Sequence, residues 1–366
     1  MSFAAGIKSI AVTLPETVRT NAYYEERYPD RVAAMAEKSL GKLWANDTAS
    51  AAAKPARTDA FSVEMAAYLD DPFRGTVERR VVRPGETALS LEKSAAERAL
   101  HAAKMSANDV DLMIVSSFQP DQMGVGNAAF LARALGMKRP AWNLESACSS
   151  SVVGFHTACG LVASGQYQRV LVVASCTYSR NADDADSVSW FLGDGAGAFV
   201  VGREEANHGL LGMHSLPTTE TCDTFYYAMV ADPGAPPRMV MQCTPSSGKI
   251  LAETAEPHLV ECAESAARAA GVRLADIDFL VCNTPTAWFS AFAARALGID
   301  RSRTISTFPR TGNIGCALMP ANLHAAACAG LVKKGDLVLV YSVGSVSTAS
   351  AAVIRWGEVA LGPGAI

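Results

Sequence analysis

The chain repeats part of its own sequence, and this duplication limits the folds open to it more than any other feature. One block, F-L-A-R-A-L-G, returns later as F-A-A-R-A-L-G. Three such blocks recur in the same order, beginning at Asp109, Phe130 and Leu161 in the first copy and at Asp276, Phe292 and Leu331 in the second. Their offsets are 167, 162 and 170 residues. A repeat of this kind predicts two structural units that are built alike.

Each copy has the pattern of helix, strand, helix, buried helix and strand. The spacing of apolar residues predicts helices over 90–104 and 258–270, and short apolar runs predict strands over 112–115, 279–281, 170–174, 337–340, 6–13, 196–201 and 351–355. Strands that alternate with helices indicate an α/β fold with layered sheets. We therefore divide the chain into an N-terminal half, 1–205, and a C-terminal half, 206–366, with an insertion at about 38–58 and a loop or hairpin within 216–249.

Composition excludes several classes of function. The formal net charge is only −4, and no run of like charges exceeds two residues, so we expect no nucleic-acid groove and no polybasic membrane patch. The uncharged stretches 146–168 and 337–354 contain Ser, Thr and Gly, and they predict buried helix and strand rather than a membrane span. The start of the chain lacks the long apolar region of a secretory signal. These features predict a cytoplasmic protein.

The nine cysteines give little support to a metal site. Their number is odd, and no C-x-x-C pair or Cys/His cluster at metal-binding spacing occurs. We expect most of the thiols to be reduced and buried. Charged residues make up 19% of the chain, below the ~25% that is typical, which favours a large interior and a subunit interface.

Two polar loops occupy equivalent places in the two copies. Cys148, in E-S-A-C-S-S-S, precedes a long uncharged helix, where free backbone N–H groups stabilise a thiolate. By itself the motif is weak, because buried cysteines often precede helices. The duplication places Asn313, in T-G-N-I-G, at the matching position of the second copy. The two loops therefore predict a shared active site where the halves meet.

These residues resemble the beta-ketoacyl-acyl-carrier-protein synthase III family of the thiolase fold. The resemblance covers nearly the whole chain, and its markers are Ala147-Cys148, the run G-D-G-A-G-A from Gly193, and Gly312-Asn313. The segment 71–80, D-P-F-R-G-T-V-E-R-R, is similar to acyltransferase-type members of specialised metabolism. The resemblance implies a duplicated five-layered αβαβα fold and a homodimer.

The resemblance also implies roles for individual residues. Cys148 matches the nucleophile that takes an acyl group from coenzyme A or an acyl carrier protein, and Asn313 matches the family's catalytic Asn. Thiolates attack thioesters well, and amide donors polarise the carbonyl. Arg74 matches an arginine-bearing segment and would meet the donor's phosphates at the mouth of the tunnel; a surface ion pair is the alternative. The thioester is a substrate, and no cofactor or metal is expected.

The sequence departs from the family pattern in two places. Asn283 stands where the family has a histidine, so a general base for the thiol is missing, although an amide still donates a hydrogen bond. The turn from Gly344 to Val346, expected to supply an oxyanion N–H, has fewer glycines than is usual. The run from Gly193 to Ala198 is interpreted as a tight turn between strands, because it lacks the Lys-Ser/Thr of a phosphate loop.

Two hypotheses follow from the sequence. The first is an acyltransferase or condensing enzyme with Cys148 as nucleophile, acting in specialised metabolism or in synthesis of the fatty-acid type. The second is a catalytically weak subunit that supports a competent partner in a hetero-oligomer, which the absence of the histidine favours.

Overall fold

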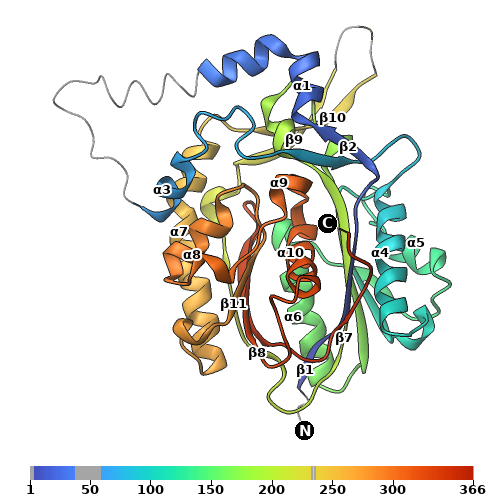
Figure 1. Ribbon diagram of the computed structural model, residues 1–366. Coiled ribbons are helices and arrows are strands. Elements are labelled where there is room, and N and C mark those ends of the chain that lie inside the picture. The colour runs from blue at the N-terminus through green and yellow to red at the C-terminus, as the bar shows by residue number, and fades with distance from the viewer. Residues whose placement is uncertain (1–3, 38–58, 232–233, 235, 366) are drawn as a thin grey trace.

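The computed structural model describes residues 4–37, 59–231, 234 and 236–365 (Figure 1). Residues 29–37 are helical. The helices are α1 (Asn21–Arg27), α3 (Ala60–Ala66), α4 (Ala88–Ala102), α5 (Ala128–Ala134), α6 (Ser150–Ala163), α7 (Ser247–Ala270), α8 (Phe289–Leu297), α9 (Phe308–Thr311) and α10 (Leu318–Cys328). The strands are β1 (Ala5–Thr13), β2 (Thr17–Thr20), β3 (Glu78–Val81), β4 (Leu112–Phe118), β5 (Ala141–Asn143), β6 (Arg169–Thr177), β7 (Asp194–Arg203), β8 (Gly209–Pro217), β9 (Phe225–Val230), β10 (Arg238–Cys243), β11 (Phe279–Cys282), β12 (Leu337–Val343), β13 (Thr348–Arg355) and β14 (Ala360–Leu361).

The two main sheets have the same strand order, as the sequence repeat predicts. The first sheet runs β14-β1-β7-β6-β4-β5, and the second runs β8-β13-β12-β11. In both sheets one pair of neighbouring strands is parallel, β4 with β6 and β11 with β12. The pairings that follow are antiparallel: β6 with β7 and β7 with β1 in the first sheet, and β12 with β13 and β13 with β8 in the second. The second sheet is therefore a copy of β1-β7-β6-β4. Even β5 has a partial counterpart, since Thr304 forms an isolated parallel bridge with Leu280 of β11.

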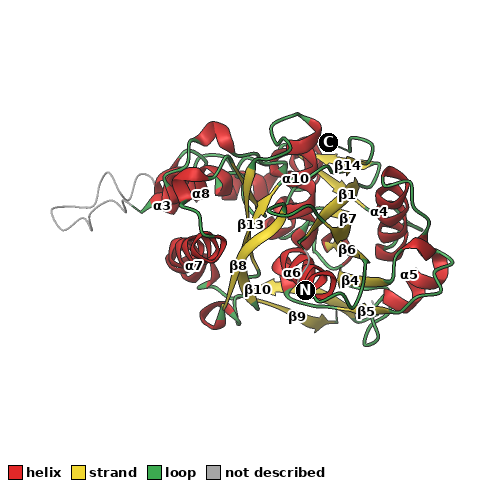
Figure 2. Cartoon of the chain, turned by 90° about the horizontal axis from the view of Figure 1, so that it is seen from below, coloured by secondary structure: helices red, strands yellow, loops and turns green. Residues whose placement is uncertain are grey.

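Helices form three layers around the two sheets (Figures 1 and 2). Helices α6 and α10 lie between the sheets, where Phe155 and Leu323 share one apolar cluster with residues of both sheets. Helices α4 and α5 cover the outer face of the first sheet, and α3, α7 and α8 cover the outer face of the second. The result is the predicted five-layered αβαβα arrangement.

Local sequence explains where several helices begin and end. Thr87 caps the start of α4 through a reciprocal capping box with Ser90. Gly271 and Gly298 end α7 and α8 in the left-handed conformation, with φ of 68° and 65°. Helix α7 begins at Ser247, eleven residues before the predicted start, and continues through Pro257. The proline hid these first turns from a pattern search, because it normally interrupts a helix.

The chain passes from the first sheet to the second between β7 and β8, which are joined by residues 204–208. One short strand crosses back, since β14 pairs with β1 at the edge of the first sheet. The segment 216–249 contains the antiparallel hairpin of β9 and β10, as expected. The predicted insertion at 38–58 lies outside the described residues.

The run from Gly193 to Ala198 is not the predicted tight turn. From Asp194 onward it is the first part of β7. The glycines serve close packing: a Cβ at Gly193 would lie 2.0 Å from the carbonyl oxygen of Thr311. The buried Asp194 carboxylate accepts hydrogen bonds from the backbone N–H groups of Val82 and Ser179. The motif therefore holds the start of β7 against the loop that carries Asn313.

Candidate active site

Cys148 lies on a 3₁₀ turn, Ala147–Ser149, directly before α6. Ala147 has φ of 49°, a left-handed conformation that residues other than glycine rarely adopt. The Glu145 carboxylate holds this turn by accepting a hydrogen bond of 2.7 Å from the Ala147 N–H. The Ser342 hydroxyl, from the second half, donates to the carbonyl oxygen of Cys148 at 2.7 Å. Backbone strain that is held in this way is common at catalytic residues.

Cys148 opens into a cavity of about 520 Å³. Aromatic side chains form much of its wall, among them Phe118, Tyr178, Phe191, Phe225, Trp288 and Phe289. Both halves contribute, because Asn313 and Val343 also line it. The cavity thus lies where the two copies meet, as the equivalent loops predict, and it suits an apolar chain next to the cysteine.

The thiol is in its neutral form at physiological pH. Burial raises the pKa of Cys148 to about 11; the Tyr178 hydroxyl counteracts part of this rise, and Glu145 adds to it. A backbone hydrogen bond at Cys148 also lowers the pKa, as expected of a helix start, but the loss of solvent outweighs it.

Tyr178 is a site residue that the sequence analysis missed. Its hydroxyl lies 3.7 Å from the Cys148 sulfur, and its ring packs edge-on against Phe118. Burial raises the pKa of Tyr178 well above its ordinary value, so the phenol keeps its proton and is able to donate a hydrogen bond to a thiolate. The signal that could have found it is position: Tyr178 directly follows β6 at the carboxyl end of the strand, where α/β sheets place ligand-binding groups.

Asn313 lines the same cavity as Cys148. Its backbone is fixed on both sides, by its N–H to the Phe191 carbonyl and by its carbonyl to the Gly193 N–H. Its side-chain oxygen accepts from the Gly315 N–H at 2.9 Å. This leaves the amide Nδ2 without a hydrogen-bond partner within the described part of the chain, as a donor for a substrate carbonyl.

Asn283 is not placed as the sequence predicts. Its Nδ2 donates to the Val343 carbonyl oxygen at 3.1 Å, and its Oδ1 accepts from the Val343 N–H at 3.1 Å. It is almost completely buried, and Val343, Pro285 and Thr286 line the cavity instead. Asn283 therefore fixes the end of β12, and the proposal that its amide meets the substrate carbonyl has no support in this geometry.

The predicted oxyanion turn lies against the Cys148 loop, but the N–H of Gly344 is bound within the turn. The Gly344 N–H already donates to the Thr348 carbonyl at 2.8 Å, so Gly344 is not the oxyanion donor. A Cβ at Gly344 would lie 2.7 Å from the Ser146 carbonyl oxygen, which explains why only glycine fits. Ser345 and Val346 line the cavity, and an oxyanion role for Val346 stays a prediction.

Arg74 lies in the cavity wall, and its place at the mouth stays a prediction. Its guanidinium donates to the carbonyl oxygens of Tyr68, at 2.7 Å, and Leu69. Burial lowers the pKa of Arg74, and the nearby Asp71 and Asp70 oppose this change. The guanidinium is therefore held close to the cavity by its own chain.

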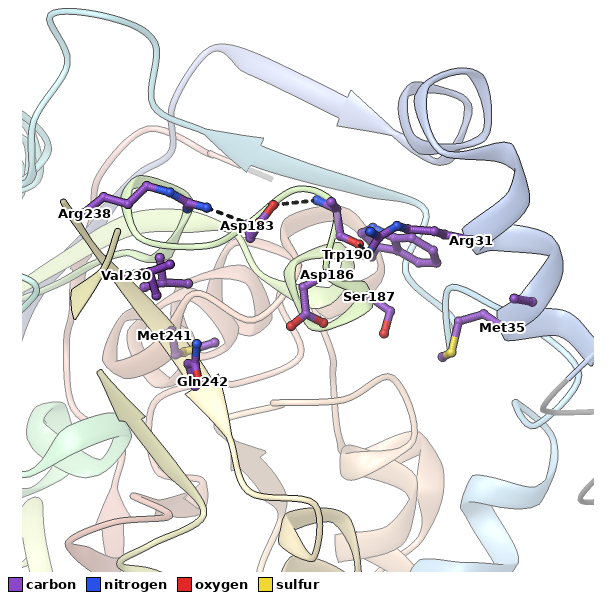
Figure 3. A pocket seen from close by; sticks show the side chains of 13 residues that line it. Arg31, Met35, Asp183, Asp186, Ser187, Trp190, Val230, Arg238, Met241 and Gln242 are labelled. Atoms are coloured by element: carbon purple, nitrogen blue, oxygen red, sulfur yellow. Dashed lines mark hydrogen bonds and ion pairs between the residues drawn. The ribbon is translucent and has the colours of Figure 1, made fainter. Parts of the chain in front are cut away.

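A second cavity, of about 590 Å³, shares Met241 with the wall of the first (Figure 3). Arg238 pairs with Asp183 at 3.0 Å, and Arg31 donates to the Ala185 carbonyl. The 3₁₀ segment Ser187–Phe191 contributes residues to both cavities and separates them. Among the residues that line this second cavity there is no cysteine or histidine, so the nucleophile belongs to the first.

Two sequence models match the parts of the chain that form this site. The model of 3-oxoacyl-[acyl-carrier-protein] synthase III matches residues 142–216, and that of its C-terminal region matches 267–356. A beta-ketoacyl-[acyl-carrier-protein] synthase III of Streptomyces coelicolor is 33% identical over 293 residues, which are 78% of this chain and 88% of that protein. This chain belongs to the same family. Membership makes it an acyltransferase of the ketosynthase III type.

Other members and solved structures agree. The beta-ketoacyl-[acyl-carrier-protein] synthase III of Rhizobium meliloti is 31% identical, covering 77% of this chain and 88% of the relative. The structure of the Thermus thermophilus synthase III is 27% identical, with a TM-score of 0.76 over 96% of this chain and 99% of that one. The priming beta-ketosynthase of the R1128 polyketide pathway shares the fold at 20% identity, with a TM-score of 0.77 and 97% of each chain covered. The fold is thus the thiolase fold that the resemblance implied.

The described part of the chain contains neither a candidate metal site nor a candidate membrane-spanning helix. Within the described ranges, no three His, Cys, Asp or Glu side chains are grouped so that they could hold a metal ion. In the same residues, every helix is too short or too polar to cross a bilayer.

Proposed function

We propose that Cys148 takes an acyl group from a coenzyme A or acyl-carrier-protein thioester and passes it to an acceptor. The observation that carries this proposal is the cavity in which Cys148, Tyr178 and Asn313 come together at the junction of the two halves. The relatives that this chain resembles are named for an acyl-carrier-protein substrate. The thioester is a substrate, and no cofactor enters the proposal.

The residues of the site divide the first step between them. The Cys148 sulfur attacks the thioester carbonyl, the bond from that carbon to the donor sulfur breaks, and the proton of Cys148 leaves on the donor thiol. Asn313 Nδ2 and the Tyr178 hydroxyl donate hydrogen bonds to the negative charge that develops on the sulfur and the carbonyl oxygen. Preorganised donors in an apolar cavity are effective because they need no rearrangement during the reaction.

Intact mass tests the proposal. Incubation with acetyl, malonyl and longer acyl thioesters of coenzyme A and of a carrier protein should add one acyl group to the chain. Cys148→Ala should show none, while Cys222→Ala, which removes an exposed cysteine outside the cavity, should acylate normally. An adduct that persists in Cys148→Ala would refute the assignment.

A second candidate is a catalytically weak subunit of a hetero-oligomeric acyltransferase. It is favoured by the neutral thiol and by Asn283, whose amide is bound to Val343 where the family has a histidine. In that case the isolated chain stays unacylated in the experiment above, and the adduct appears on a partner chain.

We further propose a homodimer and a role in specialised metabolism. The contact of Arg74 with the donor's phosphates and a cytoplasmic location stay predictions. For the dimer, the surface offers an apolar edge patch formed by Met123, Val125 and Trp142, all exposed. The Asn143 side chain ties the loop of this patch to the edge strand β5 by donating to the Val125 carbonyl at 2.8 Å. An exposed strand edge beside apolar side chains suits pairing with a second copy.

A further inference from the structure

A histidine lies in the active-site cavity on α7, far in sequence from the position where the family has one. The helix lines the cavity along one stripe, at Ser247, Leu251, Thr254, Ala255 and His258. This spacing of three and four residues places the side chains on one helix face. Of the described histidines, only His258 contributes to the cavity wall.

The carboxylate of Glu220, on a neighbouring element, lies next to this histidine. The Glu220 carboxylate lies 3.6 Å from His258 Nε2, and the His258 side chain is 10% exposed. Glu220 belongs to the 3₁₀ turn Thr219–Thr221, which packs against α7. An imidazole next to a carboxylate is a recurrent arrangement for proton transfer, because the carboxylate orients the ring and stabilises its charged form.

Hydrogen bonds connect the pair to the nucleophile's loop. The Thr218 hydroxyl donates to the Gly344 carbonyl at 2.8 Å, and the Thr218 N–H donates to the Ser347 carbonyl at 3.1 Å. Gly344 in turn lies directly against the Ser146 carbonyl, two residues before Cys148. The pair is therefore fixed to the turn that borders Cys148, on the same cavity.

Among the described residues that line the cavity, no other side chain is suited to accept a proton at neutral pH. Across the cavity, Tyr178 keeps its proton, and Arg74 and Asn313 are not bases. Titratable groups on the elements packed around His258 include Glu220, His214 on β8, Tyr341 on β12, Glu256, Glu261 and Cys262 on α7, and Glu64 on α3, which pairs with Arg295 of α8. Of the cavity-lining residue types, histidine is the one that exchanges protons near neutrality.

We propose that His258, oriented by Glu220, is the general base for the acceptor in the second step, and that the acceptor carries a hydroxyl or an amine. This inference rests on the proposed function. The acceptor oxygen or nitrogen attacks the carbonyl carbon of acyl-Cys148 and gives its proton to His258. The bond between the carbon and the sulfur breaks, and the proton passes on to the Cys148 sulfur. The products are an ester or amide and the free enzyme.

The test measures deacylation separately from acylation. The enzyme is loaded with hexanoyl-coenzyme A or, independently of coenzyme A recognition, with p-nitrophenyl hexanoate. Loss of the hexanoyl group to benzyl alcohol or benzylamine is then followed by intact mass at several pH values. His258→Asn should slow this step about 10²–10⁴-fold at each pH where the fold is intact, the usual contribution of a general base. Glu220→Gln should slow it less.

Two controls separate proton transfer from packing. Hydroxylamine is already unprotonated at neutral pH, so it should release the acyl group from His258→Asn and wild type at the same rate. His101→Asn, an exposed histidine on α4 outside the cavity, should behave as wild type. Equal alcohol rates in His258→Asn and wild type, or an equal loss with hydroxylamine, would overturn the proposal. Failure of every coenzyme A and carrier-protein thioester of the panel above to load Cys148, while p-nitrophenyl hexanoate does, would contradict the proposed function alone.

Discussion

At the scale of single residues, the chemistry depends on how Cys148 keeps its proton. Burial makes the thiol a weak acid, and the Tyr178 hydroxyl, whose oxygen lies 3.7 Å from the sulfur, lowers the pKa of Cys148 again in part. A hydrogen bond to a charged group contributes about 1.5–3 kcal/mol. Tyr178 therefore favours the thiolate as a hydrogen-bond donor, without serving as a base.

Alkylation of Cys148 should reveal this balance. The rate with iodoacetamide, followed at the Cys148 peptide by mass spectrometry, should rise with pH toward a midpoint of about 11, because only the thiolate reacts. Tyr178→Phe removes a donor to the thiolate, so the pKa of Cys148 and the midpoint of the alkylation profile should both move higher. Tyr227→Phe, another cavity tyrosine that bonds Gln119 instead, should leave the midpoint in place. A Tyr178→Phe profile equal to wild type would contradict this role.

The two asparagines should separate stability from catalysis. Asn283→Ala leaves the Val343 N–H and carbonyl without their partner, so the free energy of unfolding should fall by about 1–3 kcal/mol. Asn313→Ala removes a donor to the substrate, so acylation should slow about 10²–10³-fold with a smaller change in stability. Urea unfolding and single-turnover acylation measure the two effects. If Asn283→Ala instead slows acylation without a loss of stability, Asn283 takes part in the reaction.

At the scale of elements, one short helix closes a side of the cavity. Phe61 of α3 lines the cavity and packs edge-on against Trp288 and Phe292 of the α8 region, with ring centroids 5.9 and 5.2 Å apart. Glu64, on the same helix, pairs with Arg295 and Arg301. Because surface ion pairs contribute little, the aromatic contact carries most of the attachment.

Phe61→Ala should therefore loosen α3. We expect a loss of stability of about 3 kcal/mol, at the low end for truncating a buried Phe, and a higher KM for the thioester with little change in kcat. Val63→Ala, on the exposed face of the same helix, should change neither. Thermal unfolding and steady-state kinetics measure both; an unchanged KM for Phe61→Ala would show that α3 does not shape the binding site.

The same scale shows why some features could be predicted and others could not. The repeat predicts equal strand order because equivalent sequences form equivalent elements, and β1-β7-β6-β4 and β8-β13-β12-β11 agree with it. It also brings Cys148 and Asn313 to one cavity. It could not show that the Asn283 amide turns to Val343, nor that Tyr178 and His258 enter the cavity. Those directions depend on side-chain packing between elements that lie far apart in the sequence.

At the scale of the whole molecule, the apolar edge patch is the feature that bears on assembly, because its side chains are exposed in the single chain. The patch lies at the β5 edge of the six-stranded sheet, and the other edge is β14. A second copy paired at β5 would join the two sheets and bury Met123, Val125 and Trp142, which account for much of the exposed apolar surface at this edge.

The 38.5 kDa chain should therefore behave as a dimer in light scattering. Trp142→Lys places a charge in the patch and should shift the protein to monomer at micromolar concentration. Leu361→Lys adds the same charge at the opposite edge of the same sheet and should leave the dimer intact. A wild-type monomer, or a dimer unaffected by Trp142→Lys, would refute the patch as the interface.

The pairing of β14 with β1 has a consequence for synthesis on the ribosome. The first sheet has all its other strands once Arg203 is made, but its outer strand, at Ala360–Leu361, comes only after the whole second half. At about 5–20 residues per second, translation leaves the β1 edge uncovered for roughly 8–30 s. An uncovered strand edge pairs readily with other chains. The nascent protein should therefore need protection by a chaperone during this interval, and the completed chain should not.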